Sequence, residues 1–197
     1  SLFQVSSLMT TAGFTTTDYG VWPMMAKTTL LLVMFIGAMA GSTAGGIKVS
    51  RIIMAMKGAY INVRKLINPR YVPKAKFEGK TLEQKTIDDV FAFITLYIFI
   101  LFAVLFLLSF DPINGQVVSI VSDAGSYEVK HGFLSNFSAA LACISNVGPA
   151  FEAVGPYSSY VAYSSFSKII LTFTMMLGRL EILPVLILFN KRTWKKV

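Results

Sequence analysis

Two short stretches of the sequence could bind a metal cation through their backbone carbonyl groups. Both have glycine as the third of four residues; the members are Thr11, Ala12, Gly13 and Phe14, and Asn146, Val147, Gly148 and Pro149. Glycine gives such a stretch its backbone freedom, and rings of backbone carbonyls replace the hydration shell of an alkali ion in selective pores. We therefore predict carbonyl coordination by the first three residues of each stretch, with the Thr11 and Asn146 side chains bracing the backbone.

A short apolar segment precedes each stretch, and both segments, residues 2–10 and 133–144, are too short to cross a membrane. This order is typical of a loop that enters the membrane from outside and returns. Non-helical backbone is tolerated at that depth only when it is buried in protein or lines a water-filled cavity. An ordinary outer turn would leave the apolar segments unexplained. Because two loops do not enclose an ion, we expect two further units before Ser1.

The composition predicts an all-α membrane protein. Of the 197 residues, 54% are hydrophobic and 14% are charged, whereas soluble domains carry about 25% charged residues. Apolar runs at residues 28–46, 87–110 and 166–189 are long enough to span a bilayer. The single Cys143 and single His131 exclude a disulfide framework and a multi-cysteine metal site. Since no nucleophile–base pair or carboxylate dyad is present, we do not expect an enzyme.

The distribution of basic residues predicts the orientation. Ten of the 18 Lys and Arg residues lie between Lys48 and Lys85, and four more follow the last span at residues 191–196. The positive-inside rule places both regions in the cytoplasm and the connection 111–132 outside. The basic region is either a topology signal that contacts lipid headgroups or a docking surface for a cytoplasmic regulatory partner.

Turn and capping residues predict the local structure of this cytoplasmic region. We expect a helical extension of the first span from Lys48 and a turn at Asn68 and Pro69. A short hairpin around Gly79 follows. Thr86 is expected to cap the second span, because acidic residues occupy its first turn.

A glycine-rich segment and an arginine within the apolar runs are candidate gate residues. The segment comprises Gly41, Ser42, Thr43, Ala44, Gly45 and Gly46. It is not a nucleotide-binding P-loop, because Ile47 occupies the position of the phosphate-binding lysine. Close helix packing through small residues and a non-helical gate both remain open. Arg179 is expected near the middle of the third span, where a charge costs about 2.5–3.5 kcal/mol. It would act either as an electrostatic barrier or by bonding carbonyls of the glycine-rich segment.

Four motifs in this order resemble the Trk/Ktr/HKT superfamily of potassium transporters, and most closely its TrkH-type bacterial uptake subunits. Residues 10–16 and 145–149 are similar to the third and fourth filter sequences of that family. Residues 41–48 resemble the loop that interrupts the second helix of the third repeat. Residues 178–181 resemble the arginine-bearing helix of the fourth repeat. One departure is Ala150, where close relatives carry glycine after the proline.

The resemblance implies that the chain forms half of a four-repeat pore. Residues 1–86 would form the third repeat, with a broken second helix, and residues 87–197 the fourth. Potassium would bind the carbonyls of the first two residues of each stretch, Thr11, Ala12, Asn146 and Val147. The resemblance also implies multi-pass insertion in the bacterial inner membrane and a homodimer. It further implies a cytoplasmic nucleotide-binding partner of the TrkA or KtrA kind. Neither nucleic acid nor a covalent cofactor is expected.

A secondary transporter is the other function that the sequence leaves open. Its broken helices would bind a small solute or sodium at the membrane midplane through helix termini. Selectivity that follows the size of a monovalent cation favours the pore, whereas saturable, substrate-specific exchange favours the transporter.

Overall fold

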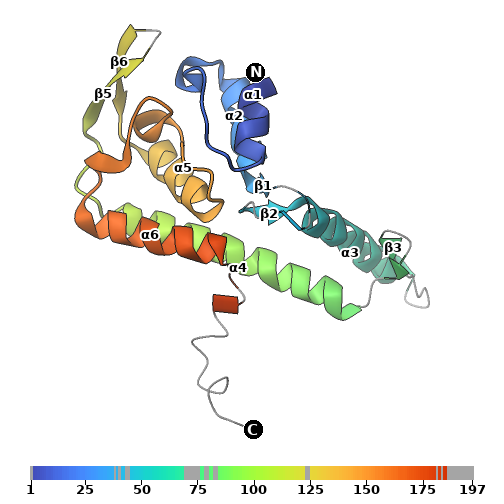
Figure 1. Ribbon diagram of the computed structural model, residues 1–197. Coiled ribbons are helices and arrows are strands. Elements are labelled where there is room, and N and C mark those ends of the chain that lie inside the picture. The colour runs from blue at the N-terminus through green and yellow to red at the C-terminus, as the bar shows by residue number, and fades with distance from the viewer. Residues whose placement is uncertain are drawn as a thin grey trace.

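The computed structural model describes most of the chain. The described residues are 2–37, 39, 41–42, 45–68, 76–77, 80–81, 84–122, 125–180, 182 and 184–185. Several predicted features fall outside them, namely Thr43, Ala44, the turn residues Pro69 and Gly79, Glu181 and the basic tail at 191–196. Figure 1 shows α4 and α6 side by side along one edge, with α5 and the α1–α2 pair above them.

The first half of the chain contains four short elements and two longer helices. In order they are α1 (Leu2–Met9), η1 (Tyr19–Val21), α2 (Met24–Phe35), β1 (Ile36–Gly37), β2 (Ile47–Lys48) and α3 (Val49–Ile67). The second half begins with a small hairpin and ends with the helix that carries Arg179. Its elements are β3 (Lys76–Phe77), β4 (Lys80–Thr81), α4 (Gln84–Leu108), β5 (Val117–Ser122), β6 (Gly125–Lys130), α5 (Phe133–Ile144), η2 (Glu152–Val154), η3 (Tyr160–Ala162) and α6 (Ser165–Arg179).

The predicted apolar run over 28–46 does not form one continuous helix, and the break lies in the region where the resemblance implies a broken second helix. Helix α2 stops at Phe35, and the extended β1 pairs in parallel with β2, Ile36 opposite Ile47. The chain between β1 and β2 therefore begins and ends at neighbouring positions. Gly41 and Gly46 have φ of 87° and 75°, a left-handed conformation that does not continue an α-helix. For the same reason α3 is a separate helix and not an extension of α2.

The other two predicted spans differ from each other. Helix α4 has 25 residues and is, within the described part of the chain, the helix long and apolar enough to cross a membrane. It begins at Gln84, whose side chain donates to Asp88 at 3.1 Å, so the predicted cap at Thr86 lies inside the helix. Helix α6 ends at Arg179, earlier than the predicted limit of 189. Ile182, Pro184 and Val185 are helical again, so Arg179 lies at the end of α6, just before an interruption of the helix at Leu180.

Two antiparallel hairpins modify the all-α expectation, although the chain is mostly helical. Strands β3 and β4 pair Phe77 with Lys80, which confirms the hairpin predicted in the cytoplasmic region. Strands β5 and β6 pair from Val117 opposite Lys130 to Ser122 opposite Gly125, in the connection predicted to lie outside. That hairpin was not predicted, although its first strand is rich in β-branched residues.

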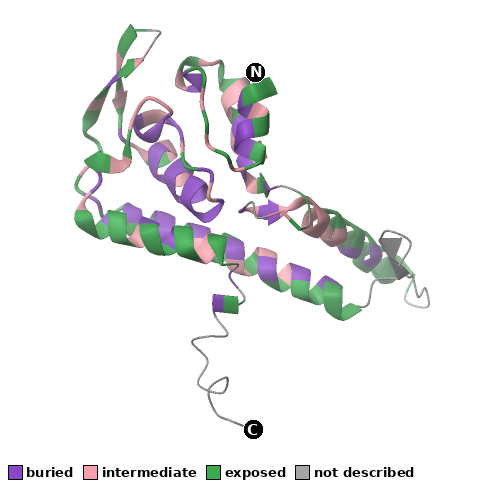
Figure 2. Ribbon diagram, in the orientation of Figure 1, coloured by how far each residue is buried: buried purple, intermediate pink, exposed green. Residues whose placement is uncertain are grey.

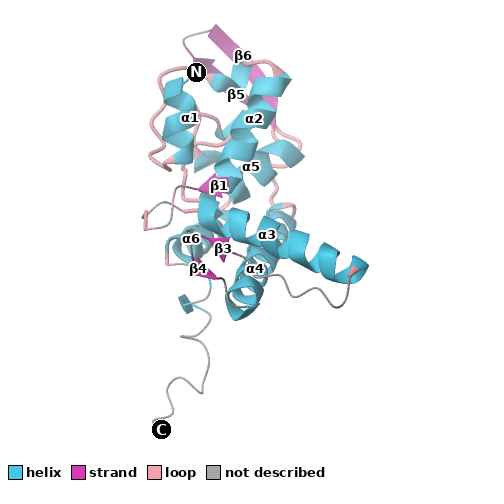
Figure 3. Ribbon diagram, turned by 90° about the vertical axis from the view of Figure 1, so that its right-hand side faces the viewer, coloured by secondary structure: helices cyan, strands magenta, loops and turns pink. Residues whose placement is uncertain are grey.

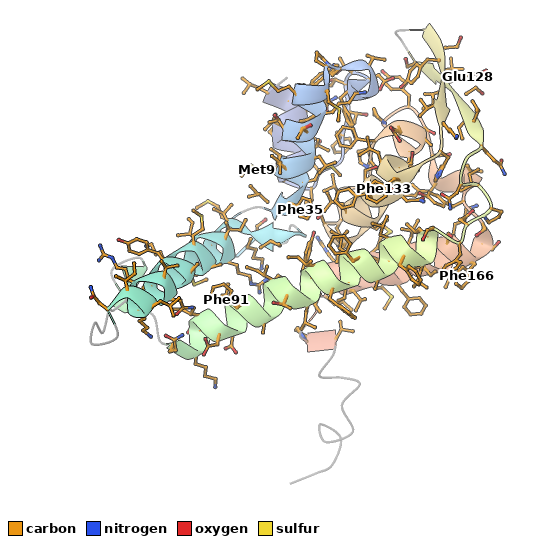
Figure 4. The ribbon with its side chains drawn as sticks, turned by 180° about the vertical axis from the view of Figure 1, so that it is seen from behind. Met9, Phe35, Phe91, Glu128, Phe133 and Phe166 are labelled. Carbon is orange, nitrogen blue, oxygen red and sulfur yellow. The ribbon has the colours of Figure 1, made fainter. Side chains whose placement is uncertain are left out.

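Helix α5 lies at the centre of the packed elements. All of its last six residues are at most 6% exposed, and Figure 2 shows the helix as almost entirely buried. The helix packs against both α4 and α6, and its small side chains at Ala139, Ala140 and Ala142 are fully buried. Phe35, labelled in Figure 4, ends α2 with its ring 6.2 Å from that of Phe137 in α5. The first half of α5 thus contacts the end of α2, and the second glycine-centred stretch begins at its other, fully packed end.

Candidate functional site

The two glycine-centred stretches follow the same backbone path, each residue of the first matching one 135 positions later. Thr11 and Asn146 have φ of 57° and 55°, and Gly13 and Gly148 have φ of 75° and 101°. Positive φ is uncommon for a residue other than glycine. Its occurrence at both equivalent positions indicates one shared local structure.

Backbone hydrogen bonds repeat in the same register. The amide of Ala12 donates to the Ser7 carbonyl at 2.9 Å, and that of Val147 donates to the Ala142 carbonyl, also at 2.9 Å. One residue earlier, the amide of Thr11 donates to the Leu8 carbonyl at 3.3 Å, and that of Asn146 to the Cys143 carbonyl at 3.2 Å. Helices α1 and α5 therefore end in the same way, and each releases an extended chain at the same point.

The two stretches lie directly against each other. A Cβ atom added to Gly13 would lie 2.5 Å from the carbonyl oxygen of Val147 and 3.3 Å from Cδ of Pro149. A side chain at position 13 would therefore occupy the space between the two stretches. A Cβ atom on Gly148 would meet no described atom within 4 Å. The residues predicted to act together, 11–14 and 146–149, are neighbours in space.

Three tyrosine hydroxyls, which sequence reasoning missed, hold the second stretch and the residues on either side of it. Tyr97 shares a 2.8 Å hydrogen bond with the Ser145 hydroxyl. Tyr160 donates to the Gly148 carbonyl at 2.8 Å, and Tyr19 donates to the Ala150 carbonyl at 3.0 Å. Since their partners are as many as 131 positions away, no local spacing signals these contacts.

The predicted bracing by the Asn146 side chain was wrong. Its amide nitrogen is buried and has no hydrogen-bond partner within the described part of the chain. The first stretch is braced from its own helix, because the Ser7 hydroxyl donates to the Phe14 carbonyl at 2.6 Å. The side chains of Thr11 and Asn146 are therefore not needed to explain how the backbone of the two stretches is held.

The glycine-rich segment reaches the base of the second stretch. A Cβ atom on Gly37 would collide with the Gly45 carbonyl, and one on Gly45 would collide with the Ser145 carbonyl. Gly178 in α6 approaches the same place, where a Cβ atom would collide with the Ile144 carbonyl and lie 2.5 Å from the Asn146 amide nitrogen. Three glycines thus allow backbone segments to meet where side chains would keep them apart.

A cavity of about 170 Å³ lies beside this contact. Its wall combines the glycine-rich segment with three basic residues, Lys48, Arg51 and Arg179. The Arg51 guanidinium lies 4.0 Å from the centre of the Phe93 ring. Because Arg179 is the last residue of α6, its positive charge interacts favourably with the negative C-terminal end of the helix dipole. The structure therefore brings Arg179 together with Ser42, Gly45 and Gly46, four of the residues predicted to form a gate.

An ionisable pair links the β5–β6 hairpin to the loop that follows the first stretch. Tyr127 of β6 donates to Asp18 at 2.6 Å, and the other oxygen of Asp18 accepts from the Gly20 amide at 2.8 Å. Burial, followed by the effect of Asp18, raises the pKa of the Tyr127 phenol well above its usual value. The phenol therefore remains a donor, and the hairpin stays tied to the loop that follows Phe14. Figure 3 shows this hairpin beyond the ends of α1 and α2.

Comparisons with known proteins agree on one family. A family model described as "Cation transport protein", TrkH, matches residues 1–196. The Trk system potassium uptake protein TrkH of Vibrio parahaemolyticus is 35% identical over 195 residues, which cover 99% of this chain and 36% of that protein. TrkG of Escherichia coli is 34% identical over 195 residues, covering 99% and 36%.

Structural similarity extends over the same range. The crystal structure of the potassium transporter TrkH from Vibrio parahaemolyticus matches with a TM-score of 0.77 at 33% identity. The match covers 98% of this chain and 37% of that one. The chain therefore spans little more than a third of the length of the relatives that it matches.

Proposed function

Because the chain belongs to the TrkH family of cation transport proteins, we propose that it contributes part of a pore for potassium uptake across the bacterial plasma membrane. The curated relatives are potassium uptake proteins, and the chain matches about a third of each. The remaining positions around the ion would come from sequence that those relatives carry in addition. The protein acts as a transporter and not as an enzyme.

In this proposal the ion is held by backbone oxygens of both stretches. The coordinating carbonyls are those of Thr11 and Ala12 in the first stretch and Asn146 and Val147 in the second. The observation that supports this assignment most directly is the contact between Gly13 and the Val147 carbonyl. Since potassium must exchange its water for several oxygens at once, two stretches that share a register and touch each other are suited to contribute together.

The gate in this proposal is the glycine-rich segment together with Arg179. Gly45 lies against the Ser145 carbonyl, so the segment contacts the residue just before the coordinating carbonyls. The three basic residues around the neighbouring cavity would repel a cation that leaves the filter. Displacement of the segment and of Arg179 would open the path.

Regulation would come from a cytoplasmic nucleotide-binding subunit of the TrkA or KtrA kind, acting on a homodimer. Helix α3 supports this part of the proposal, because it carries Lys57, Arg64 and Lys65 on exposed positions. Apolar residues of the same helix, including Met56 and Leu66, are 68% and 84% exposed. A surface of this mixed character suits a protein partner.

The test is the selectivity of Gly13→Ser and Gly148→Ser, made in the full-length protein and reconstituted in liposomes. Serine is strained at positive φ, and at position 13 it would also meet the Val147 carbonyl. We expect the ratio of potassium to sodium flux to fall in both variants. Gly115→Ser is the matched control, since Gly115 also has positive φ, 88°, but lies in the outer connection. Wild-type ratios in both filter variants would refute the assignment.

A further inference from the structure

We propose that Tyr160 is a positioning residue that fixes the outer end of the second stretch and thereby supports ion selectivity. This inference rests on the proposed function, since it concerns the same carbonyl-lined stretch. Its basis is the 2.8 Å hydrogen bond from the Tyr160 hydroxyl to the Gly148 carbonyl. That bond is the one hydrogen bond of Gly148 that the described residues provide.

The peptide that receives this bond has few other restraints. Gly148 is exposed and has φ of 101°, and a Cβ atom there would meet nothing within 4 Å. Pro149 fixes its own φ and has no amide hydrogen to donate. The direction of the Gly148 carbonyl therefore depends on the torsions of a glycine, and the Tyr160 hydroxyl selects one direction.

A cavity next to Gly148 leaves room for this peptide to turn. It has a volume of about 230 Å³ and extends between the end of α5 and the side of α6, with Tyr160, Cys143 and Leu171 among its lining residues. Side chains packed against the Gly148 peptide would restrict its rotation sterically. The cavity leaves it without that restriction. Loss of the hydroxyl bond would let the carbonyl rotate, and the neighbouring Val147 carbonyl would follow because the two share a short, non-helical backbone.

Comparison of the two stretches explains why an external hydroxyl is needed here. In the first stretch the Ser7 hydroxyl bonds the Phe14 carbonyl from within the preceding helix, at 2.6 Å. The equivalent position before the second stretch is Ala142, which is fully buried and has no hydroxyl. Tyr160 bonds the carbonyl of the neighbouring position instead. Among the four residues of each stretch, the carbonyl bonded by a side-chain hydroxyl is thus that of Phe14 in the first and that of Gly148 in the second, and the two hydroxyls come from different places.

Neighbouring groups hold Tyr160 itself in place. Its ring stacks on that of Tyr163, with centres 6.2 Å apart and planes 23° apart. The Tyr163 hydroxyl donates to Asn136 at 2.9 Å, and Asn136 donates to Asn114 at 2.7 Å. This chain of contacts connects the Gly148 carbonyl to the outer end of α4. The contact with Tyr160 is made by the Tyr163 ring, which Tyr163→Phe retains, and the hydroxyl that this variant loses bonds Asn136. Tyr163→Phe is therefore a control that removes a hydroxyl from the same aromatic pair and keeps the ring stack on Tyr160.

The experiment compares Tyr160→Phe with Tyr163→Phe in the full-length protein in liposomes. A net hydrogen bond changes an equilibrium by a factor of about 5. We therefore expect Tyr160→Phe to lower the ratio of potassium to sodium flux about fivefold. The melting temperature of this variant in detergent should fall by a few degrees at most. Tyr163→Phe should keep the wild-type flux ratio.

Each outcome decides the proposal. An unchanged flux ratio in Tyr160→Phe overturns it, as does an equal loss of selectivity in both variants, which would indicate general disturbance of the aromatic pair. Failure of Tyr160→Phe to fold also counts against it, because a positioning bond is dispensable for folding. If Gly13→Ser alters selectivity and Tyr160→Phe does not, the filter assignment stands and only the role of Tyr160 falls.

Discussion

Replacing Gly178 with alanine tests the close approach of α6 to the end of α5. A Cβ atom at this position would collide with the Ile144 carbonyl and lie 2.5 Å from the Asn146 amide nitrogen. The Ile144 carbonyl belongs to the backbone at the end of a buried helix. It cannot move aside by a rotamer change, as a flexible side chain could. Accommodation therefore requires α6 to move outward from the residues that begin the second stretch.

Two effects of opposite sign determine the magnitude. Alanine is favoured over glycine inside a helix by about 1 kcal/mol. Overpacking in a tightly packed interior costs about 1–3 kcal/mol, and the upper part of that range applies because the obstructing atom belongs to backbone. We expect the Gly178→Ala variant to lose about 1–2 kcal/mol of unfolding free energy, because packing outweighs helix propensity. Its potassium uptake should fall as well, since Ile144 directly precedes Ser145 and Asn146.

Unfolding in mixed detergent and SDS micelles measures the first effect, and uptake in liposomes measures the second. Gly132→Ala is the matched control, because the nearest described atom to its Cβ would be the Lys130 carbonyl at 3.9 Å, an ordinary contact. A Gly178→Ala variant that is more stable than the wild type would show that helix propensity dominates. That result would refute the contact between α6 and the end of α5.

Three further changes test other parts of the structure. Arg179→Ala should raise cation flux in liposomes if its charge is a barrier; loss of folded protein would indicate a structural role instead. His131→Phe should flatten the dependence of melting temperature on pH: burial lowers the pKa of the folded imidazole, although Asp111 and Glu152 raise it in part. Stability is therefore lost as pH falls below about 6.5, where the unfolded chain takes up the proton; an unchanged slope would contradict this. Asp111→Ala should cost about 1–3 kcal/mol of unfolding free energy, because the carboxylate accepts from the Ser164 amide at 3.1 Å and hydroxyl at 2.7 Å. Stability equal to that of the wild type in chemical unfolding would rule out that anchoring role.

Local features of the candidate site could be predicted from residue type and spacing. Gly13 and Gly148 stand out because both follow short apolar segments, and both have positive φ. The structure also places the two stretches against each other, at Gly13 and Val147. Helix α4 was predicted from the length of its apolar run, and the hairpin of β3 and β4 from turn residues. Each of these signals lies within one continuous segment of the sequence.

Features that depend on distant contacts could not be predicted in this way. Tyr19 and Tyr97 bond partners that are 131 and 48 positions away, and no periodicity connects such residues. The end of α6 at Arg179 also depends on what surrounds it, because the apolar run itself continues. The position of Arg179 at a helix terminus therefore emerges only from the fold.

In the glycine-rich segment, small residues are needed for a different reason from the helix packing considered from the sequence. Its small residues suggested close packing of one helix on another. In the structure Gly37 contacts Gly45, and Gly45 contacts Ser145, so successive backbone segments are stacked without side chains between them. Backbone atoms in contact do not yield by changing rotamers. A shift of the segment by a fraction of an ångström must therefore move Ser145 or break the contact, which couples the proposed gate directly to the residue before the coordinating carbonyls.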